Sequence, residues 1–283
     1  MAYNFNLDAT YVEQNKEIIL KDIVFGAVHG LTIPVMAKQL GVKGSMAIHP
    51  TTLNPALRTA DGCGFEPDGG LTISQRIIDT EVKKVNMEFC PDDLLNRFAE
   101  YKVRVGADEG ALPFEGEIIE GVVKSVAKQV EADVWTKILA LDGDFKRITS
   151  NEGAYNDIMK VYKEMPEEVL EDGIIFVSPA TFRAYITELV NKNLYHYNPA
   201  DGDLNEMFLA GSGVKVRKAH GLVDGTIFAT SPKNMIYGTD FLDNKEEVKL
   251  WYSDDADKYR LKIKFNYGVQ VAFPELCVIS TRE

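Results

Sequence analysis

The stretch FEGEIIEGVVKSVAKQVEADVWTKILA, residues 114–140, is the most regular part of this amino-acid sequence. Apolar residues recur in it at every fourth position, with further apolar residues beside them. They are Ile118, Val122, Val126, Val130 and Val134, flanked by Ile119, Val123, Ala127, Trp135, Ile138 and Leu139. This spacing predicts a single helix with a wide apolar face. Such a helix would be about 40 Å long, which is more than a small domain needs, so we expect it to serve as a structural spine.

The region that follows the predicted helix, residues 150–239, alternates between helix and strand patterns. A helix is predicted at 155–165, and the short apolar run at 173–177 predicts a buried strand. Ser178 precedes a proline and is a typical N-cap for a helix that extends to Val190. Three shorter strands are predicted at 214–217, 226–230 and 234–238.

The N-terminal third is less regular. Residues 12–25 are weakly helical, and we interpret them as an arm. Residues 41–70 contain six glycines and several prolines, which favour an extended, turn-rich segment. The alternating pattern of residues 71–89 predicts a long strand that returns from a hairpin. A short helix is predicted to begin at Pro91 and to continue to Tyr101.

The C-terminal part has the pattern of β-strands. Residues 248–252 and 259–265 alternate between polar and apolar side chains and are joined by a polar loop, which predicts a hairpin. Further strands are predicted at 269–273 and 276–279, with a bend at Pro274. The sequence contains no internal repeat, which excludes repeat architectures.

Composition excludes several classes of protein. The 283 residues include 31 Lys+Arg and 43 Asp+Glu, so the net charge is −12, which argues against tight binding of nucleic acid. A hydrophobic fraction of 45% with 26% charged residues is typical of a globular chain. The length allows two domains or one elongated body with insertions. No apolar run approaches the ~20 residues of a membrane-spanning helix.

The three cysteines, Cys63, Cys90 and Cys277, are too few and too widely spaced for a disulfide framework or a zinc knuckle. We expect reduced thiols. Cys63 has no basic neighbour closer than Arg58 to lower its pKa, so nothing marks it as a nucleophile.

Other side chains that could carry chemistry do not form a recognisable site. The four histidines lie in four separate segments without metal-ligand spacing; they are His29, His49, His196 and His220. Two acidic groups could in principle hold a cation; they are Asp61, Glu66 and Asp68 in the glycine-rich stretch, and Asp254, Asp255 and Asp257 in the C-terminal hairpin. The first group is expected in a mobile loop and the second at a solvated hairpin tip. We assign no catalytic, cofactor-binding or metal-binding residue.

The order of these segments resembles that of a known family. The segments that carry the resemblance are IIFVSPATF at 174–182, GVKV at 213–216, NMIYGTD at 234–240 and FNYGVQVAFP at 265–274. With the arm, the glycine-rich loop and the spine helix, they make nearly the whole chain resemble the major capsid protein of tailed bacteriophages, the Hong Kong phage type of capsid fold.

The resemblance implies an α+β fold with an N-terminal arm, an extended β-hairpin loop, a peripheral domain with a long spine helix, and an axial domain. The implied boundaries are 1–40 for the arm, 41–90 for the extension loop and returning strand, 91–149 for the peripheral domain with its spine helix, 150–239 for the axial domain, and 240–283 for the C-terminal strands that complete the peripheral domain.

The resemblance also implies a function without catalysis. Subunits of this family assemble through pentamers and hexamers into an icosahedral head around double-stranded DNA, which is enclosed without sequence-specific binding. We therefore expect a virion protein that assembles in the host cytoplasm and contacts no membrane. Because the N-terminal arm is short, a separate scaffolding protein is expected, with a portal and decoration proteins as further partners.

Two alternatives remain open at this stage. An encapsulin, the shell protein of a bacterial nanocompartment, has the same fold and encloses an enzyme cargo. An acidic two-domain enzyme is the alternative from a different class, and residues 61–68 would be its best candidate site.

Overall fold

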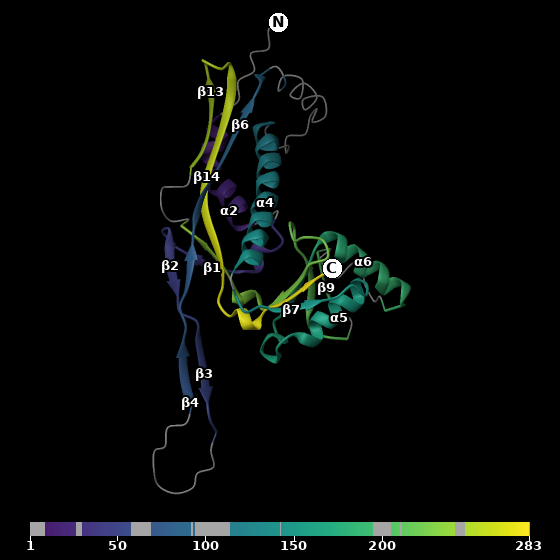
Figure 1. Cartoon of the computed structure of the whole chain (residues 1–283). Coiled ribbons are helices and arrows are strands. Elements are labelled where there is room, and N and C mark those ends of the chain that lie inside the picture. Colours follow the sequence, from purple (N-terminus) through teal and green to yellow (C-terminus); the bar gives the residue numbers. More distant parts are fainter. Residues whose placement is uncertain are drawn as a thin grey trace.

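The computed structural model describes residues 9–26, 30–57, 69–91, 93, 114–141, 143–194, 205–209, 211–240 and 247–282. These residues form an elongated molecule (Figure 1). One sheet and the longest helix stand upright in this view, a second sheet with two helices lies to one side, and a two-stranded ribbon projects away from both. The α+β class predicted from the sequence is confirmed.

The helices are α1 (Ala9–Gln14), α2 (Lys16–Phe25), α4 (Phe114–Ala140), α5 (Ala154–Glu164) and α6 (Pro179–Asn191), with short 3₁₀ turns η1 (Ile33–Val35), η2 (Glu167–Val169), η3 (Pro232–Asn234) and η4 (Pro274–Leu276). The strands are β1 (Ala37–Leu40), β2 (Ser45–Ile48), β3 (Thr51–Pro55), β4 (Gly69–Ile73), β5 (Arg76–Asp79), β6 (Glu81–Phe89), β7 (Lys146–Thr149), β8 (Ile174–Val177), β9 (Glu206–Phe208), β10 (Lys215–Lys218), β11 (Ile227–Thr230), β12 (Met235–Thr239), β13 (Glu247–Ser253), β14 (Lys258–Val271) and β15 (Val278–Thr281).

The first sheet is organised around β14, the longest strand. β6 and β13 pair with the same first half of β14 and therefore lie on its two sides. The C-terminal end of β14 pairs with β12, which in turn pairs with β1. Tyr259, Leu261 and Ile263 alternate along β14 and are buried in the same core as Ile23 of α2 and Val126 of α4. One face of this sheet is thus covered by the helices.

The second sheet has six strands in the order β7-β15-β11-β8-β10-β9. Its central strand β8 is buried on both faces, as the unbroken apolar run at 173–177 predicts. Ile175 and Val177 pack in the core that contains α5 and α6, whereas Ile174 and Phe176 pack in the core that contains α4. The helices on both faces explain why β8 carries no polar side chain.

Helix α4 connects the two sheets. It covers the bounds predicted from the sequence, and its apolar face contacts α2 and β14 along the first sheet. Near its C-terminus, the ring of Trp135 lies 5.2 Å from Phe176 and 5.5 Å from Phe228, measured between centroids, in the second sheet. A helix of this length therefore packs against two sheets rather than one.

A buried carboxylate fixes the chain to α4 just before β1. Oε1 of Glu131 accepts hydrogen bonds from the backbone N–H groups of Leu31, of Thr32 at 2.6 Å and of Ile33 at 3.4 Å. Trp135 Nε1 donates to Thr32 Oγ1 at 3.1 Å, and Arg217 Nε of β10 donates to the Leu31 carbonyl at 2.8 Å. The segment between α2 and β1 is thereby held by the long helix and by the second sheet.

Two strand predictions are wrong in detail. The strand expected at 71–89 is divided into β4, β5 and β6, because β5 pairs with β2 whereas β6 pairs with β14. The change of partner occurs at Thr80, whose N–H bonds to the Gly44 carbonyl at 2.7 Å. Conversely, the strands expected at 259–265 and 269–273 are one strand, because β12 takes over as partner where β6 and β13 end.

Sheet membership also departs from the expected boundaries. β12 lies within the range 150–239 but joins the first sheet, and β15 lies within 240–283 but sits between β7 and β11 in the second sheet. Val278 and Ile279 on β15 are buried in the two different cores, so this strand completes the second sheet. The helix expected from Pro91 to Tyr101 lies almost wholly outside the described residues.

Candidate functional site

The two histidines that the structure describes differ in their exposure. His49 is exposed, whereas His220 is half-buried and its pKa is lowered by desolvation and by the nearby Lys128 and Lys218. His29 and His196 lie outside the described residues. Within the described ranges, no group of three or more His, Cys, Asp or Glu side chains is arranged to hold a metal ion.

The two acidic groups have different outcomes. Asp254, Asp255 and Asp257 are exposed in the turn between β13 and β14, where the Tyr252 hydroxyl donates to Asp257. This is the solvated hairpin tip that the sequence predicts. The other group, Asp61, Glu66 and Asp68 with Cys63, lies outside the described residues.

The two described cysteines differ in their surroundings. Cys277 is buried, and burial raises the pKa of its thiol to about 12, so it stays protonated. Cys90 is partly exposed, and both cysteines are free thiols.

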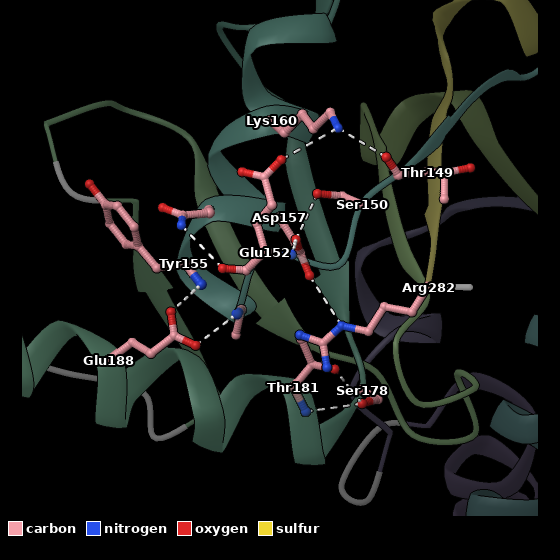
Figure 2. A network of polar contacts seen from close by, with 12 residues as sticks. Thr149, Ser150, Glu152, Tyr155, Asp157, Lys160, Ser178, Thr181, Glu188 and Arg282 are labelled. Carbon is pink, nitrogen blue, oxygen red and sulfur yellow. Dashed lines mark hydrogen bonds and ion pairs between the residues drawn. The ribbon is translucent and has the colours of Figure 1, made fainter.

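A polar network surrounds the N-terminus of α5 (Figure 2). Asp157 accepts from Ser150 Oγ at 2.7 Å, from the Glu152 N–H at 2.9 Å and from Arg282 Nε at 3.1 Å. Burial opposes ionisation of Asp157, but these three donors outweigh it and lower its pKa. The carboxylate therefore joins β7, α5 and the C-terminal segment.

A second carboxylate in Figure 2 caps the same helix from outside. Glu188 of α6 accepts from the backbone N–H groups of Ala154 at 2.8 Å and Tyr155 at 2.9 Å. These are orphan donors of the first turn of α5, and a negative charge there is favourable. Ser178 caps α6 as predicted, accepting from the Thr181 N–H at 3.1 Å. The network thus consists of two helix caps and a carboxylate that joins three segments, and it has no aligned nucleophile and base.

The part of the molecule best suited to an external partner is the projecting ribbon, which consists of β2 and β3 paired with β5 and β4. Paired residue numbers add up to 124 in both strand pairs, as in Ser45 with Asp79 and Pro55 with Gly69. The short break between the pairs keeps this register, since the Ser74 N–H bonds to the Pro50 carbonyl at 3.0 Å. The ribbon is therefore one hairpin, about 35 Å long.

The outer half of the ribbon has one apolar and one polar face. Leu53 lies directly opposite Leu71, so the two side chains share a face. Ile73 lies on the same face, because alternate residues of a strand point to the same side. Their side chains are 70%, 58% and 60% exposed, respectively. On the other face Thr52 lies opposite Thr72. We call the surface formed by Leu53, Leu71 and Ile73 the ribbon patch.

The base of the ribbon is anchored to the first sheet. Ile78 is fully buried against Gly238, and Gln270 Nε2 donates to the Ile77 carbonyl at 2.7 Å. Gly268 permits this approach, since a Cβ there would lie 2.0 Å from the Asp79 carbonyl oxygen. The ribbon is thus fixed at its base while every described residue of β3 and β4 is exposed.

This arrangement is suited to binding rather than to chemistry. An isolated two-stranded ribbon is marginally stable in water, and exposed apolar side chains gathered on one face favour contact with another surface. The glycine-rich composition of residues 41–70 predicts an extended loop here but does not predict the ribbon patch. The signal was available in the apolar residues at odd positions, but the face could be assigned only once the register was known.

None of the helices among the described residues has the length and apolarity needed to cross a membrane. No protein-family model matches the sequence, and no curated protein sequence matches it either.

Solved structures do match over nearly the whole chain. A chain of the satellite phage P4 procapsid including size determination (Sid) protein has a TM-score of 0.61 at 10% identity, covering 100% of this chain and 94% of that one. The structure of Microbacterium phage Oxtober96 gives 0.58 at 12% identity, with 90% and 91% covered. The virus-like particle from Pyrococcus furiosus gives 0.57 at 13% identity, with 94% and 98% covered.

At such low identities these likenesses concern the fold, and they cover between 90% and 100% of this chain. The order of elements and the matched structures agree with the resemblance carried by residues 174–182 and 265–274. The chain therefore has the major capsid fold of tailed bacteriophages.

Proposed function

We propose that this chain is a shell-forming protein, the major capsid protein of a tailed bacteriophage. Copies of it would assemble through pentamers and hexamers into an icosahedral head that encloses double-stranded DNA. The observation that carries the proposal is the ribbon, which is anchored at its base and presents the exposed ribbon patch far from its own core. In a shell, this patch would be buried on a neighbouring copy.

Burial of the ribbon patch on a neighbouring copy would be energetically favourable. Each large aliphatic side chain gains about 1 to 2 kcal/mol when a mostly exposed surface becomes buried. Leu53, Leu71 and Ile73 together would supply several kcal/mol per contact, and a closed shell repeats the contact at every subunit. Burial on a neighbour would also stabilise the ribbon itself, which has no core of its own.

A net charge of −12 suits a container wall that must not hold DNA tightly, because duplex DNA would be repelled rather than bound. The protein would act without catalysis in the virion capsid and assemble in the host cytoplasm. A separate scaffolding protein, a portal and decoration proteins are the further partners we propose. The division into arm, extension loop, peripheral domain and axial domain also belongs to this proposal.

An encapsulin-type compartment shell is the second candidate. It is favoured by the match to the virus-like particle from Pyrococcus furiosus, which covers 98% of that chain. The contents of purified shells separate the two candidates, because nucleic acid supports the phage head and a co-purifying enzyme supports the compartment.

To test the proposal, the chain is expressed alone and together with neighbouring genes from its source. The products are imaged by negative-stain electron microscopy. Shells, tubes or rings of five or six subunits are expected. The double variant Leu53→Lys/Leu71→Lys should remain folded, because both side chains are exposed in the subunit, but it should fail to assemble.

The matched control is Thr52→Lys/Thr72→Lys, which adds the same charges to the polar face of the same strands. It should interfere with assembly less than the ribbon-patch variant. Normal particles from the Leu53→Lys/Leu71→Lys protein would exclude the ribbon patch from the assembly contact. A strictly monomeric product under every condition would contradict the proposed function.

A further inference from the structure

The solvent-facing side of the first sheet carries a concentration of positive charge next to the acidic hairpin tip, where Asp254, Asp255 and Asp257 are exposed. The side chains of β14 that alternate with the buried ones point to this side, and their cross-strand partners share it. The cationic residues of this surface are Lys84 on β6, Lys249 on β13, and Lys258, Arg260, Lys262 and Lys264 on β14. We call them, with Glu88, Glu247 and Trp251, the basic face. Figure 1 shows the three strands side by side.

The basic face has a charge opposite to that of the rest of the protein. Six cations and two carboxylates give it a charge of +4, so the remainder of the chain must carry −16 to reach the total of −12. An even distribution of charge over the surface would make this face acidic as well. The two signs are therefore segregated on the molecule.

Ion pairs within the basic face leave its excess charge in place. Glu88 contacts Lys258 at 3.3 Å and Arg260 at 2.9 Å. Glu247 contacts Lys249 and Lys262, both at 2.6 Å, and these hydrogen bonds lower its pKa to about 2. Each carboxylate is thus shared by two cations.

The rest of the surface is suited to contact with a protein. The side chains of β14 on this side are only half-buried, and Trp251 is 41% exposed directly opposite Arg260. Tryptophan and arginine are the residues that contribute most often to protein–protein hot spots.

Charge complementarity identifies the partner. The face cannot pair with its own copy across a twofold axis, because like charges would meet. A second copy of this chain carries the compensating charge of −16 outside this face, and the same charge would repel duplex DNA from the subunit. We propose that the basic face docks against an acidic surface of a second copy of this chain, in a head-to-tail contact.

A head-to-tail contact has a geometric consequence. Interfaces between two different surfaces of identical subunits generate rings when the rotation closes. This inference rests on the proposed function, since rings of five or six subunits are the units of the proposed shell. The basic face would be the surface that attracts one subunit to the next, and its charge would make the contact sensitive to salt.

The test compares two charge-reversed variants in which the same number of lysines is changed. Lys84→Glu/Lys264→Glu alters the basic face without removing any of the ion pairs described above. Lys124→Glu/Lys163→Glu makes the same change of charge at exposed positions on α4 and α5. Circular dichroism and thermal unfolding confirm that both variants are folded.

Self-association is measured by sedimentation velocity from 50 to 500 mM NaCl, and binding of a labelled DNA duplex by fluorescence anisotropy. The wild-type protein should associate more weakly as salt rises. The basic-face variant should associate about tenfold more weakly than wild type or not at all, while the control variant behaves as wild type. The unmodified protein gives a second test through its salt dependence, even if the basic-face variant does not fold.

Several results would overturn the inference. The first is self-association of the wild type that does not depend on salt. The second is an equal loss of self-association in the basic-face variant and the control variant. The third is duplex binding by the wild type that only the basic-face variant loses, while its self-association persists. Failure of the two proposals can be told apart. Shells formed equally by the basic-face variant would contradict only the inference, whereas salt-dependent association through this face without rings or shells would contradict only the proposed function.

Discussion

At position 131 a carboxylate without solvent exposure is held by the backbone amides of a distant segment. One oxygen of Glu131 accepts three N–H groups, and the other, Oε2, has no hydrogen-bond partner. Burial raises the pKa of this carboxyl, and the backbone donors and Arg217 only partly oppose it. The carboxyl group therefore positions residues 31–33, but its ionised form is destabilised by burial.

This balance predicts a pH dependence of stability. Because the pKa of Glu131 in the folded protein lies above the ordinary value of 4.5, the native state holds the proton more tightly than the unfolded chain. The free energy of unfolding should then fall as the pH rises from about 4.5 through the folded-state pKa. Glu131→Gln keeps an acceptor for the three amides and removes the charge, so it should flatten this part of the profile.

Urea unfolding at several pH values measures the effect, with Glu131→Ala as the comparison. Alanine leaves three buried amides without an acceptor, so it should cost about 2 to 4 kcal/mol near pH 4.5 and less as the pH rises and the wild type itself loses stability. A Gln variant that keeps the wild-type pH profile, or that is as unstable as the Ala variant, would contradict this account of the carboxylate.

Among the elements, α4 shows how far the periodicity of a helix predicts its packing. Val126 is 4% exposed and packs between α2 and the first sheet, whereas its neighbour Ser125 is exposed. Val126→Asp should prevent folding, because an unpaired charge on this face would cost a large part of a typical stability of 5 to 15 kcal/mol. Ser125→Asp should change the stability by no more than about 0.5 kcal/mol.

Far-UV circular dichroism of the soluble fraction and the yield of soluble protein provide the measurement. Folded Val126→Asp protein with a thermal midpoint near that of Ser125→Asp would mean that the apolar stripe does not face the core.

Local patterns predicted the elements whose structure depends on local interactions. The helix at 114–140, the buried strand at 173–177 and the Ser178 cap follow from periodicity, an unbroken apolar run and capping chemistry, and all three are confirmed. What the sequence could not predict depends on partners that are distant along the chain. The division of 71–89 and the place of β15 are of this kind, since each depends on which strand lies beside it.

The candidate surfaces were missed for the same reason. Lys84 and Lys264 lie far apart in the sequence and become neighbours only through the register of β6 and β14. Taken alone, a short basic segment on a strand resembles any solvated face. The ribbon patch likewise needs the pairing of Leu53 with Leu71 before its apolar residues can be assigned to one face.

For the whole molecule, the position of α4 means that the two sheets are joined by a shared core. The helix buries one part of its length on the first sheet and another on the second. Trp135 lies where these parts meet, fully buried between Phe176 and Phe228 and hydrogen-bonded to Thr32. If α4 separates from one sheet, the shared core opens and apolar surface of both sheets is exposed to water. The described body should therefore unfold in one cooperative step.

The chain contains two tryptophans, which makes this prediction measurable. In the variant Trp251→Phe, the emission of Trp135 reports the contact between α4 and the second sheet. In Trp135→Phe, the emission of Trp251 reports the edge strand β13 of the first sheet.

Because both sheets depend on the same helix, the midpoint of urea unfolding from each emission signal should equal the midpoint from far-UV circular dichroism of the same variant. Trp135→Phe should lower the midpoint, since it removes aromatic contacts and a buried hydrogen bond, but it should do so equally for both probes. Two separated transitions in Trp251→Phe would show that the second sheet unfolds on its own and that α4 is a linker between independent units rather than their common core.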